Sequence, residues 1–320
     1  MKIFFASAEE INSFYKTLML LEKPNLLVSY YYLKKWNNRK TPIELFLTQA
    51  KALSGQLFLD SGAHTFLVKD DMKKTSVHHK HKKTDDPHIY MENYYKWVAK
   101  YGHYFDFIAE LDVAACPGVG YPTVQKWRKD LEGLGFKDKL MVVSHYKYFS
   151  SIFPNWEDEW RRLLTEYPCV AIGDDPPQAI LDRHFAIWKE MGLNNKVHGF
   201  AETKIWKLSR YPYYSVDSTS WHLGARFGAI FTYERDPKRG MALKSFRVDR
   251  GIGGGSKSYH KFITKVYPRL EPGAKKYTIQ QMWDYTEGSY FRNVQNALAF
   301  QRLEADLTKI WALRGVSWPL

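Results

Sequence analysis

The chain has 320 residues, of which 45% are hydrophobic and 25% charged, a composition typical of a globular protein with an apolar core. Its formal net charge of +13 favours a polyanionic partner, above all nucleic acid, although an anionic membrane surface or plain solubility gives the same balance. The two cysteines exclude a disulfide framework and, without a CxxC pair, a zinc site built from thiolates. No apolar run approaches membrane-spanning length, and the first one is too short for a secretory signal. We therefore expect a soluble cytoplasmic protein with no membrane partner.

Strand-like and helix-like patterns alternate along most of the chain. Apolar and β-branched runs predict strands at 2–7, 25–33, 56–60, 105–112, 139–146, 169–174, 196–201 and 213–217, with two further strands at 228–233 and 241–248. Amphipathic periodicity and capping signals predict helices at 8–22, from 41 onward, and at 88–101, 121–134, 155–167, 176–191 and 202–210.

Strands separated by helices indicate βαβ units and a parallel sheet. About eight such repeats that close on themselves predict an α/β fold, a (β/α)8 TIM-like barrel. An open doubly wound sheet is the alternative, but no GxGxxG motif follows the first strand. We expect a barrel domain over 1–250, then a glycine-rich connector and C-terminal helices over 251–320 that pack on the barrel. The helical pattern over 278–313 is expected to break near Gly288.

One segment, residues 68–87, is crowded with Lys, His and Asp and has almost no apolar periodicity, so it predicts a basic loop inserted into the barrel. It brings together His78, His79, His81 and His88. A metal cluster is conceivable, but the run lacks an i,i+4 histidine pair, and the neighbouring lysines repel a cation. We expect a phosphate-contacting loop, with no metal and no cofactor.

Three acidic residues come at the ends of apolar strands: Asp60, Asp112 and Asp217. A buried carboxylate without a partner is costly, and the strands of a (β/α) barrel all end at one rim. Their pattern therefore favours a shared site, although a single acid in this place is often a helix N-cap or a loop anchor.

Two of these strands carry motifs with a specific resemblance. Leu59-Asp-Ser-Gly-Ala63 and Val216-Asp-Ser-Thr-Ser-Trp221 resemble segments of the guanine transglycosylases, which exchange a base in tRNA, and most closely those of the viral and bacterial branch that inserts 7-deazaguanine bases into DNA. Glu110-Leu-Asp112, Ile172-Gly173 and His198-Gly-Phe-Ala201 fall between them in the same order. One departure is clear: the tRNA enzymes carry a cysteine-rich zinc site after the second motif, whereas this chain has no cysteine beyond Cys169.

The resemblance implies a DNA-guanine transglycosylase that replaces guanine with a free 7-deazaguanine derivative, such as 7-cyano-7-deazaguanine, through a covalent bond to the sugar C1′. It implies Asp217 as nucleophile and Asp60 as general acid/base. Retaining glycosidases use two carboxylates in the same way. The implied base-binding residues are Asp112, Gly173, Ser61, Gly62 and His145. A structural role for His145 is an open alternative.

Other readings remain open. They are a tRNA-guanine transglycosylase, an N-glycosylase that releases the base to water, and a barrel that binds nucleic acid without catalysis. The target base must leave the stack before its C1′ can react, so an accessory protein that opens the duplex is a further conceivable partner. If the chain is viral, the expected compartment is the host cytoplasm. The basic residues expected to contact DNA phosphates are Lys73, Lys74, Lys80, Lys82, Lys83, Arg235, Lys238, Arg239, Arg247, Arg250 and Lys257.

Overall fold

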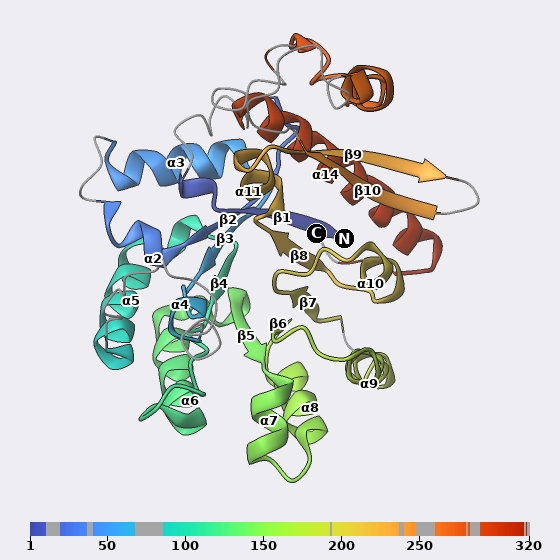
Figure 1. The fold of residues 1–320 in the computed structure, drawn as a ribbon. Coiled ribbons are helices and arrows are strands. Elements are labelled where there is room, and N and C mark those ends of the chain that lie inside the picture. The colour runs from blue at the N-terminus through green and yellow to red at the C-terminus, as the bar shows by residue number, and fades with distance from the viewer. Residues whose placement is uncertain are drawn as a thin grey trace. The chain divides into compact units, whose positions relative to one another are not determined.

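The computed structural model describes residues 1–10, 20–36, 41–67, 86–192, 194–236, 240–247, 260–279, 281, 289–316 and 318. The strands β1 to β8 follow one another in chain order around a closed barrel with helices between them, which confirms the predicted α/β class and (β/α)8 architecture (Figure 1). The barrel strands are β1 (Lys2–Ala6), β2 (Asn25–Ser29), β3 (Leu57–Asp60), β4 (Phe107–Ala109), β5 (Leu140–Ser144), β6 (Cys169–Ile172), β7 (Lys196–Gly199) and β8 (Ser215–Ser218).

The helices are α2 (Tyr30–Leu33), α3 (Ile43–Leu53), α4 (His64–Leu67), α5 (Pro87–Tyr101), α6 (Gly120–Leu131), α7 (Tyr146–Ile152), α8 (Trp156–Glu166), α9 (Gln178–Glu190), α10 (Ile205–Arg210), α11 (Ser220–Arg226) and α14 (Ser289–Leu313). Short 3-10 or π turns are η1 (Ala8–Glu10), η4 (Gly102–Tyr104), η5 (Glu132–Phe136), η6 (Lys137–Lys139), η7 (Phe262–Val266) and η8 (Tyr267–Arg269). None of the described helices is both long enough and apolar enough to span a bilayer.

The chain divides into two compact units. The first comprises Met1–Leu26, Leu53–Gly55 and Ala201–Leu320, and the second comprises Leu27–Ala52 and Gln56–Phe200. The domain boundary predicted at residue 250 lies among residues 248–259, outside the described part of the chain.

In the second unit, the strands β3 to β7 pair in parallel, each with the next along the chain. Every residue of β5 and β6 is buried, as expected for parallel strands that are covered on both faces. The ring of Phe58 on β3 packs against Phe107, His198 and Phe200. These apolar strands end after three to five residues, and the chain segments that follow neighbouring strands leave the sheet side by side.

In the first unit, β1 pairs in parallel with β8, in a register that sets Phe4 opposite Asp217. The two later strands, β9 (Ala229–Asp236) and β10 (Gly240–Arg247), form an antiparallel pair of their own beside α14 (Figure 1). The buried Asn296 of α14 accepts the N–H of Phe231 on β9 at 2.7 Å. The helix α14 therefore holds this hairpin through a buried amide as well as through apolar packing.

The predicted strands and helices agree with the described elements in most places, but several bounds were wrong. The strand predicted over 105–112 is the shorter β4, which ends at Ala109, three residues before Asp112. Residues 30–33, predicted as the end of a strand, form the helical turn α2. A strand was expected as far as residue 146, but β5 ends at Ser144 and the unexpected helix α7 begins two residues later. Of the helix expected over 8–22, residues 8–10 form the turn η1, and residues 11–19 lie outside the described part.

The basic segment predicted over 68–87 falls largely outside the described residues, which resume at Asp86. The carboxylate of Asp86 caps α5 by accepting the backbone N–H groups of His88 and Ile89. Pro87 occupies the first turn, where its missing N–H costs nothing. His88, the one described histidine of the predicted cluster, lies edge-on to Trp127.

Candidate functional site

Three polar side chains meet where the neighbouring strands β4, β5 and β6 end. Asp112 follows β4 by three residues, His145 directly follows β5, and Asp174 follows β6 by two. Because β4 pairs with β5 and β5 with β6, the chain segments that leave these strands are also neighbours. The sheet register thus brings together residues that are about thirty positions apart in sequence.

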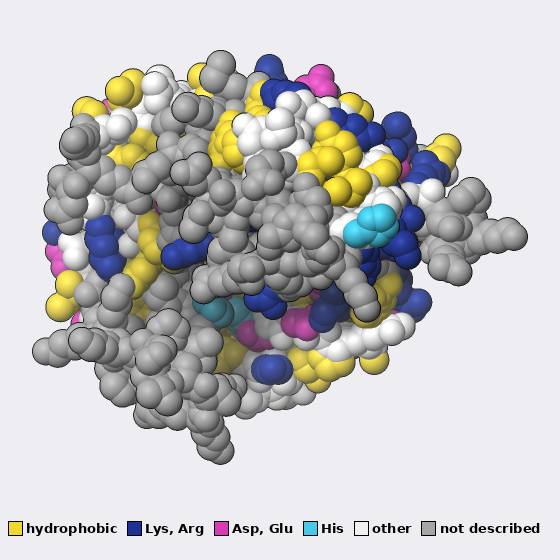
Figure 2. Space-filling view, turned by 45° about the horizontal axis from the view of Figure 1, so that its top comes forward, with side chains coloured by type: hydrophobic (Ala, Val, Ile, Leu, Met, Phe, Trp, Pro, Cys, Tyr) yellow, Lys and Arg dark blue, Asp and Glu magenta, His cyan; other side chains and the backbone are white. Residues whose placement is uncertain are grey.

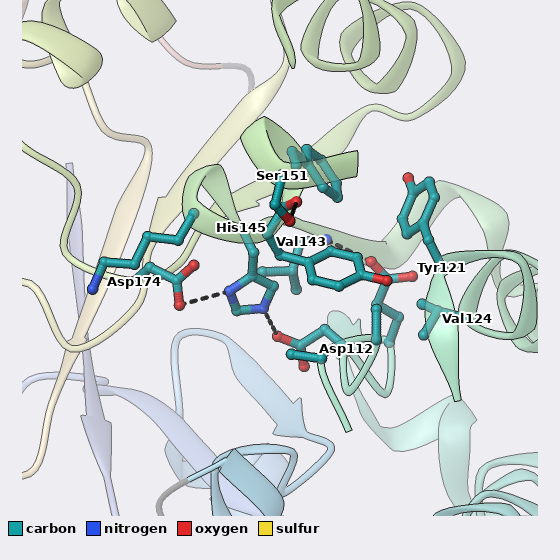
Figure 3. Close-up of a pocket in the computed structure, with 13 residues that line it drawn as sticks. Asp112, Tyr121, Val124, Val143, His145, Ser151 and Asp174 are labelled. Atoms are coloured by element: carbon teal, nitrogen blue, oxygen red, sulfur yellow. Dashed lines mark hydrogen bonds and ion pairs between the residues drawn. The ribbon is translucent and has the colours of Figure 1, made fainter. Parts of the chain in front are cut away.

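The imidazole of His145 lies between two carboxylates (Figure 3). Its Nε2 is 2.5 Å from Oδ2 of Asp112, and its Nδ1 is 2.9 Å from Oδ1 of Asp174. Burial alone would lower the pKa of His145, but the hydrogen bonds and charges of both carboxylates outweigh it and raise the pKa to about 10. Burial likewise opposes ionisation of Asp174, and His145 more than offsets it, so the pKa of Asp174 lies below its ordinary value. The ring is an imidazolium at neutral pH, with both N–H groups donating.

Gly173 makes room for this ring. A Cβ atom at this position would lie 2.8 Å from Cε1 and 2.9 Å from Nδ1 of His145, closer than real Cβ contacts come. The next residue, Asp174, has a left-handed backbone with φ of +66°, which is uncommon outside glycine but tolerated by Asp. Gly173 was predicted to bind the base, and its close neighbour in the structure is the ring of His145.

A buried ion pair supports the same strand ends. Nε of Arg128 on α6 donates to Oε2 of Glu110 at 2.7 Å and its Nη2 donates to Oε1 at 3.0 Å, and both side chains are 1% exposed. Oε1 of Glu110 also accepts the N–H of Val143 on β5 at 2.6 Å. Burial raises the pKa of Glu110, and the charge of Arg128 opposes this. The pair thus ties β4 to both β5 and α6, two residues before Asp112.

A cavity of about 360 Å³ opens beside these groups, between the ends of β4 and β5 and the helices α6 and α7. Figure 3 shows Tyr121 and Val124 on one side of it and His145 between the two carboxylates on the other. Its volume lies within the range of small-molecule pockets, about 300–1,000 Å³. The lining residues are Glu110, Asp112, Ala114, Ala115, Tyr121, Val124, Val143, His145, Lys147, Tyr148, Phe149, Ser151 and Asp174. The cavity can therefore take a flat ring that presents N–H groups to a carboxylate.

The segment after β3 forms a tight left-handed turn. Asp60 is the last residue of β3, and its Oδ2 accepts the N–H of Gly62 at 3.2 Å. The carbonyl of Ser61 accepts the hydroxyl of Tyr90 at 2.8 Å. Gly62 has φ of +82°, and a Cβ here would lie 2.6 Å from Oη of Tyr90 and 2.8 Å from Cβ of Tyr31. The glycine of this motif is therefore required by the turn.

Asp217 belongs to the first unit, where it is the third residue of β8 and 7% exposed. Its Oδ1 accepts the N–H of Ala201 at 2.7 Å. Ala201 has φ of +51°, a strained value for a residue with a side chain, so the donor is held in place by the surrounding fold. The hydroxyl of Ser218 accepts the N–H of Ser220 at the start of α11.

Of the residues expected to contact DNA, only Arg235 and Arg247 are described, and both are exposed. Nη1 of Arg235 lies 3.7 Å from Oδ1 of Asp306. The other residues of that set (Lys73, Lys74, Lys80, Lys82, Lys83, Lys238, Arg239, Arg250 and Lys257) lie outside the described residues. On the face shown in Figure 2, the described Lys and Arg side chains are scattered among apolar and acidic ones. Within the described residues, no group of three or more His, Cys, Asp or Glu is arranged to hold a metal ion.

Two important residues of this region were missed from the sequence. Asp174 follows an apolar strand as the three predicted acids do, so the same signal was available for it. Arg128 lies on the buried face of α6 with Val124, Trp127 and Leu131. A cation at such a position signals a buried acidic partner.

Comparison with protein-family models and with curated protein sequences finds no match to this chain.

Proposed function

We propose that the protein is a DNA-guanine transglycosylase, which exchanges a guanine of DNA for a free 7-deazaguanine derivative. In this proposal Asp217 is the nucleophile, Asp60 the general acid/base, and Asp112 the main acceptor for the base. DNA and the free base are the partners, and no cofactor takes part. The roles of the two catalytic carboxylates rest on the resemblance of their motifs.

The observation that carries the proposal is the cavity with the Asp112 carboxylate in its wall. Guanine and its 7-deaza analogues present two adjacent donors, the ring N1–H and the exocyclic amine, and a carboxylate can accept both. Oδ2 of Asp112 accepts from His145, while Oδ1 has no hydrogen-bond partner among the described residues. Asp60 ends the strand β3, which pairs with β4 just ahead of Asp112. These features support recognition of a guanine-type base by the second unit.

The chemistry proceeds in two displacements. A carboxylate oxygen of Asp217 bonds to C1′ while the electron pair of the bond between C1′ and N9 passes to guanine, which takes a proton from Asp60. The incoming base then returns its ring N–H proton to Asp60 and attacks C1′, and the bond to Asp217 breaks. The net result is one base exchanged for another, with no water consumed.

The proposal is tested by incubating the protein with DNA and, in parallel, with tRNA, each with labelled guanine and with 7-cyano-7-deazaguanine. We expect incorporation into DNA alone, and its loss in Asp217→Asn and Asp60→Asn. Asp158→Asn is the matched control, because Asp158 is an exposed carboxylate in the first turn of α8. Incorporation into tRNA alone would establish the RNA reading, and abasic sites without incorporation would indicate an N-glycosylase. No exchange of either base in either polymer would refute the proposal.

A further inference from the structure

Two hydrogen bonds and one close backbone contact fix the orientation of the His145 ring. Carboxylates hold both nitrogens, at 2.5 Å and 2.9 Å, and the backbone of Gly173 lies against the ring edge that carries Cε1 and Nδ1. His145 itself is the N-cap residue of α7, with extended backbone angles. Rotation of the ring would break two charge-assisted hydrogen bonds at once, and these are about twice as strong as neutral ones.

We propose that His145 is a positioning residue, held by Asp174, that fixes the Asp112 carboxylate so that its Oδ1 accepts the N–H groups of a guanine-type base. This inference rests on the proposed function. It adds two assignments to it: Asp174 acts through His145 rather than on the base, and Gly173 is needed because the ring occupies the space of its side chain.

The charges around the ring explain why two carboxylates are needed. A histidine with one carboxylate partner keeps its second nitrogen free to change tautomer or to lose a proton. The second carboxylate, Asp174, keeps the Nδ1–H in place, so the Nε2–H always points at Oδ2 of Asp112 (Figure 3). The other charges nearby are Lys147, an exposed cation on α7 close to Asp174, and Glu110, whose charge is balanced by Arg128.

This arrangement also predicts which bases are selected. Because Oδ2 of Asp112 already accepts an N–H of His145, the carboxylate presents its other oxygen, Oδ1, to the cavity as an acceptor. A guanine-type edge, with N1–H beside an amine, matches it. An adenine-type edge has an unprotonated ring nitrogen next to its amine. This nitrogen is an acceptor, and it would face the acceptor oxygen of Asp112. We therefore expect free adenine to compete at least tenfold less well than a 7-deazaguanine.

The first test needs no enzymatic activity. In protein with isotope-labelled histidine, the imidazole nitrogens of His145 are followed by NMR from pH 5 to pH 10. We expect both to stay protonated well above pH 8, and the midpoint to fall by at least one pH unit in Asp174→Asn. His184, whose burial lowers its pKa to about 4, is an internal reference that stays neutral across this pH range. A midpoint for His145 near pH 6.5 in the unaltered protein would overturn the inference.

The second test measures equilibrium binding of free 7-cyano-7-deazaguanine by calorimetry. We expect Asp174→Asn and Gly173→Ala each to weaken binding about tenfold, while Asp158→Asn binds as the unaltered protein does. Thermal unfolding identifies any variant that fails to fold, and Asp174→Asn, which keeps side-chain size, then decides. Unchanged binding in a folded Asp174→Asn, or no binding of the base to the unaltered protein, would refute the positioning role. Weakened binding without any base exchange in DNA would instead leave the positioning role standing and remove the proposed function.

Discussion

The buried pair of Glu110 and Arg128 allows a quantitative test of how the site is supported. Both side chains are 1% exposed, and two hydrogen bonds of 2.7 Å and 3.0 Å join them. Removing one partner leaves an uncompensated buried charge, which costs about 3–5 kcal/mol. We therefore expect Arg128→Met and Glu110→Gln each to lower the free energy of unfolding by that amount. The glutamine keeps an acceptor for the N–H of Val143, so the stability lost in Glu110→Gln comes mainly from the missing charge.

The double variant separates the pair from its surroundings. Replacing both partners removes both charges, and such replacements are often close to neutral. We expect the double variant to be more stable than the sum of the single losses predicts, by about 2 kcal/mol, which lies within the range of about 0.5–3 kcal/mol for groups in direct contact. Urea unfolding followed by circular dichroism measures each value. Single losses that simply add would refute this account of the pair.

A matched control is available on the surface. Arg183 also makes a two-bond contact with a carboxylate, at 2.8 Å and 2.7 Å to Glu157, but its side chain is 38% exposed. Solvent screens such pairs, so Arg183→Met should cost far less than Arg128→Met. Equal losses at the two sites would mean that burial is not what makes the Arg128 pair matter.

Three further outcomes are expected. Gly62→Ala should lower the melting temperature and cost about 1–3 kcal/mol, because its methyl group would meet Tyr90 and Tyr31 at a φ of +82°, whereas the exposed Gly133→Ala, with nothing within 4 Å, should not. Burial lowers the pKa of His184 to about 4, so between pH 6.5 and pH 4 this histidine is protonated in the unfolded chain but neutral in the folded one. The free energy of unfolding should therefore fall as pH drops from about 6.5 to 4. Urea midpoints measure this decline, and His184→Gln should remove its share of it. The pKa of His145 is raised to about 10, so its contribution is fully present below pH 6.5 and is lost as pH rises toward 10, and Asp174→Asn should flatten that alkaline decline.

The barrel could be predicted because the residues that end its strands are visible in the sequence. Runs such as Leu57–Asp60 and Cys169–Ile172 are short, apolar and followed by acids, glycine or proline, and helical patterns separate them. Local composition gave a wrong prediction where tertiary contacts determine the secondary structure. The aromatic run Tyr30–Leu33 has strand-forming residues, yet Tyr30 packs against Tyr94 and Trp97 of α5 and the segment is helical.

The site was predictable in part for a similar reason. Acids after apolar strands are visible in sequence, so Asp112 was identified as a candidate, and Asp174 could have been identified by the same rule. The catalytic roles of Asp60 and Asp217 stay predictions. The partnership of His145 with two carboxylates was not predictable, because it depends on the register of β4, β5 and β6 and on the space left by Gly173. Which nitrogen meets which carboxylate is a property of the folded chain alone.

The proposed mechanism requires Asp217 to form a covalent bond with C1′ of a DNA nucleotide. The direct measurement is to incubate the protein with DNA, denature it, digest both polymers and search by mass spectrometry for the peptide that carries Asp217. We expect a deoxyribose-linked adduct on Asp217, in larger amount when the free base is withheld. The adduct should be absent in Asp217→Asn and retained in Asp158→Asn. Base exchange that proceeds in Asp217→Asn, or an adduct on any other carboxylate, would contradict this mechanism.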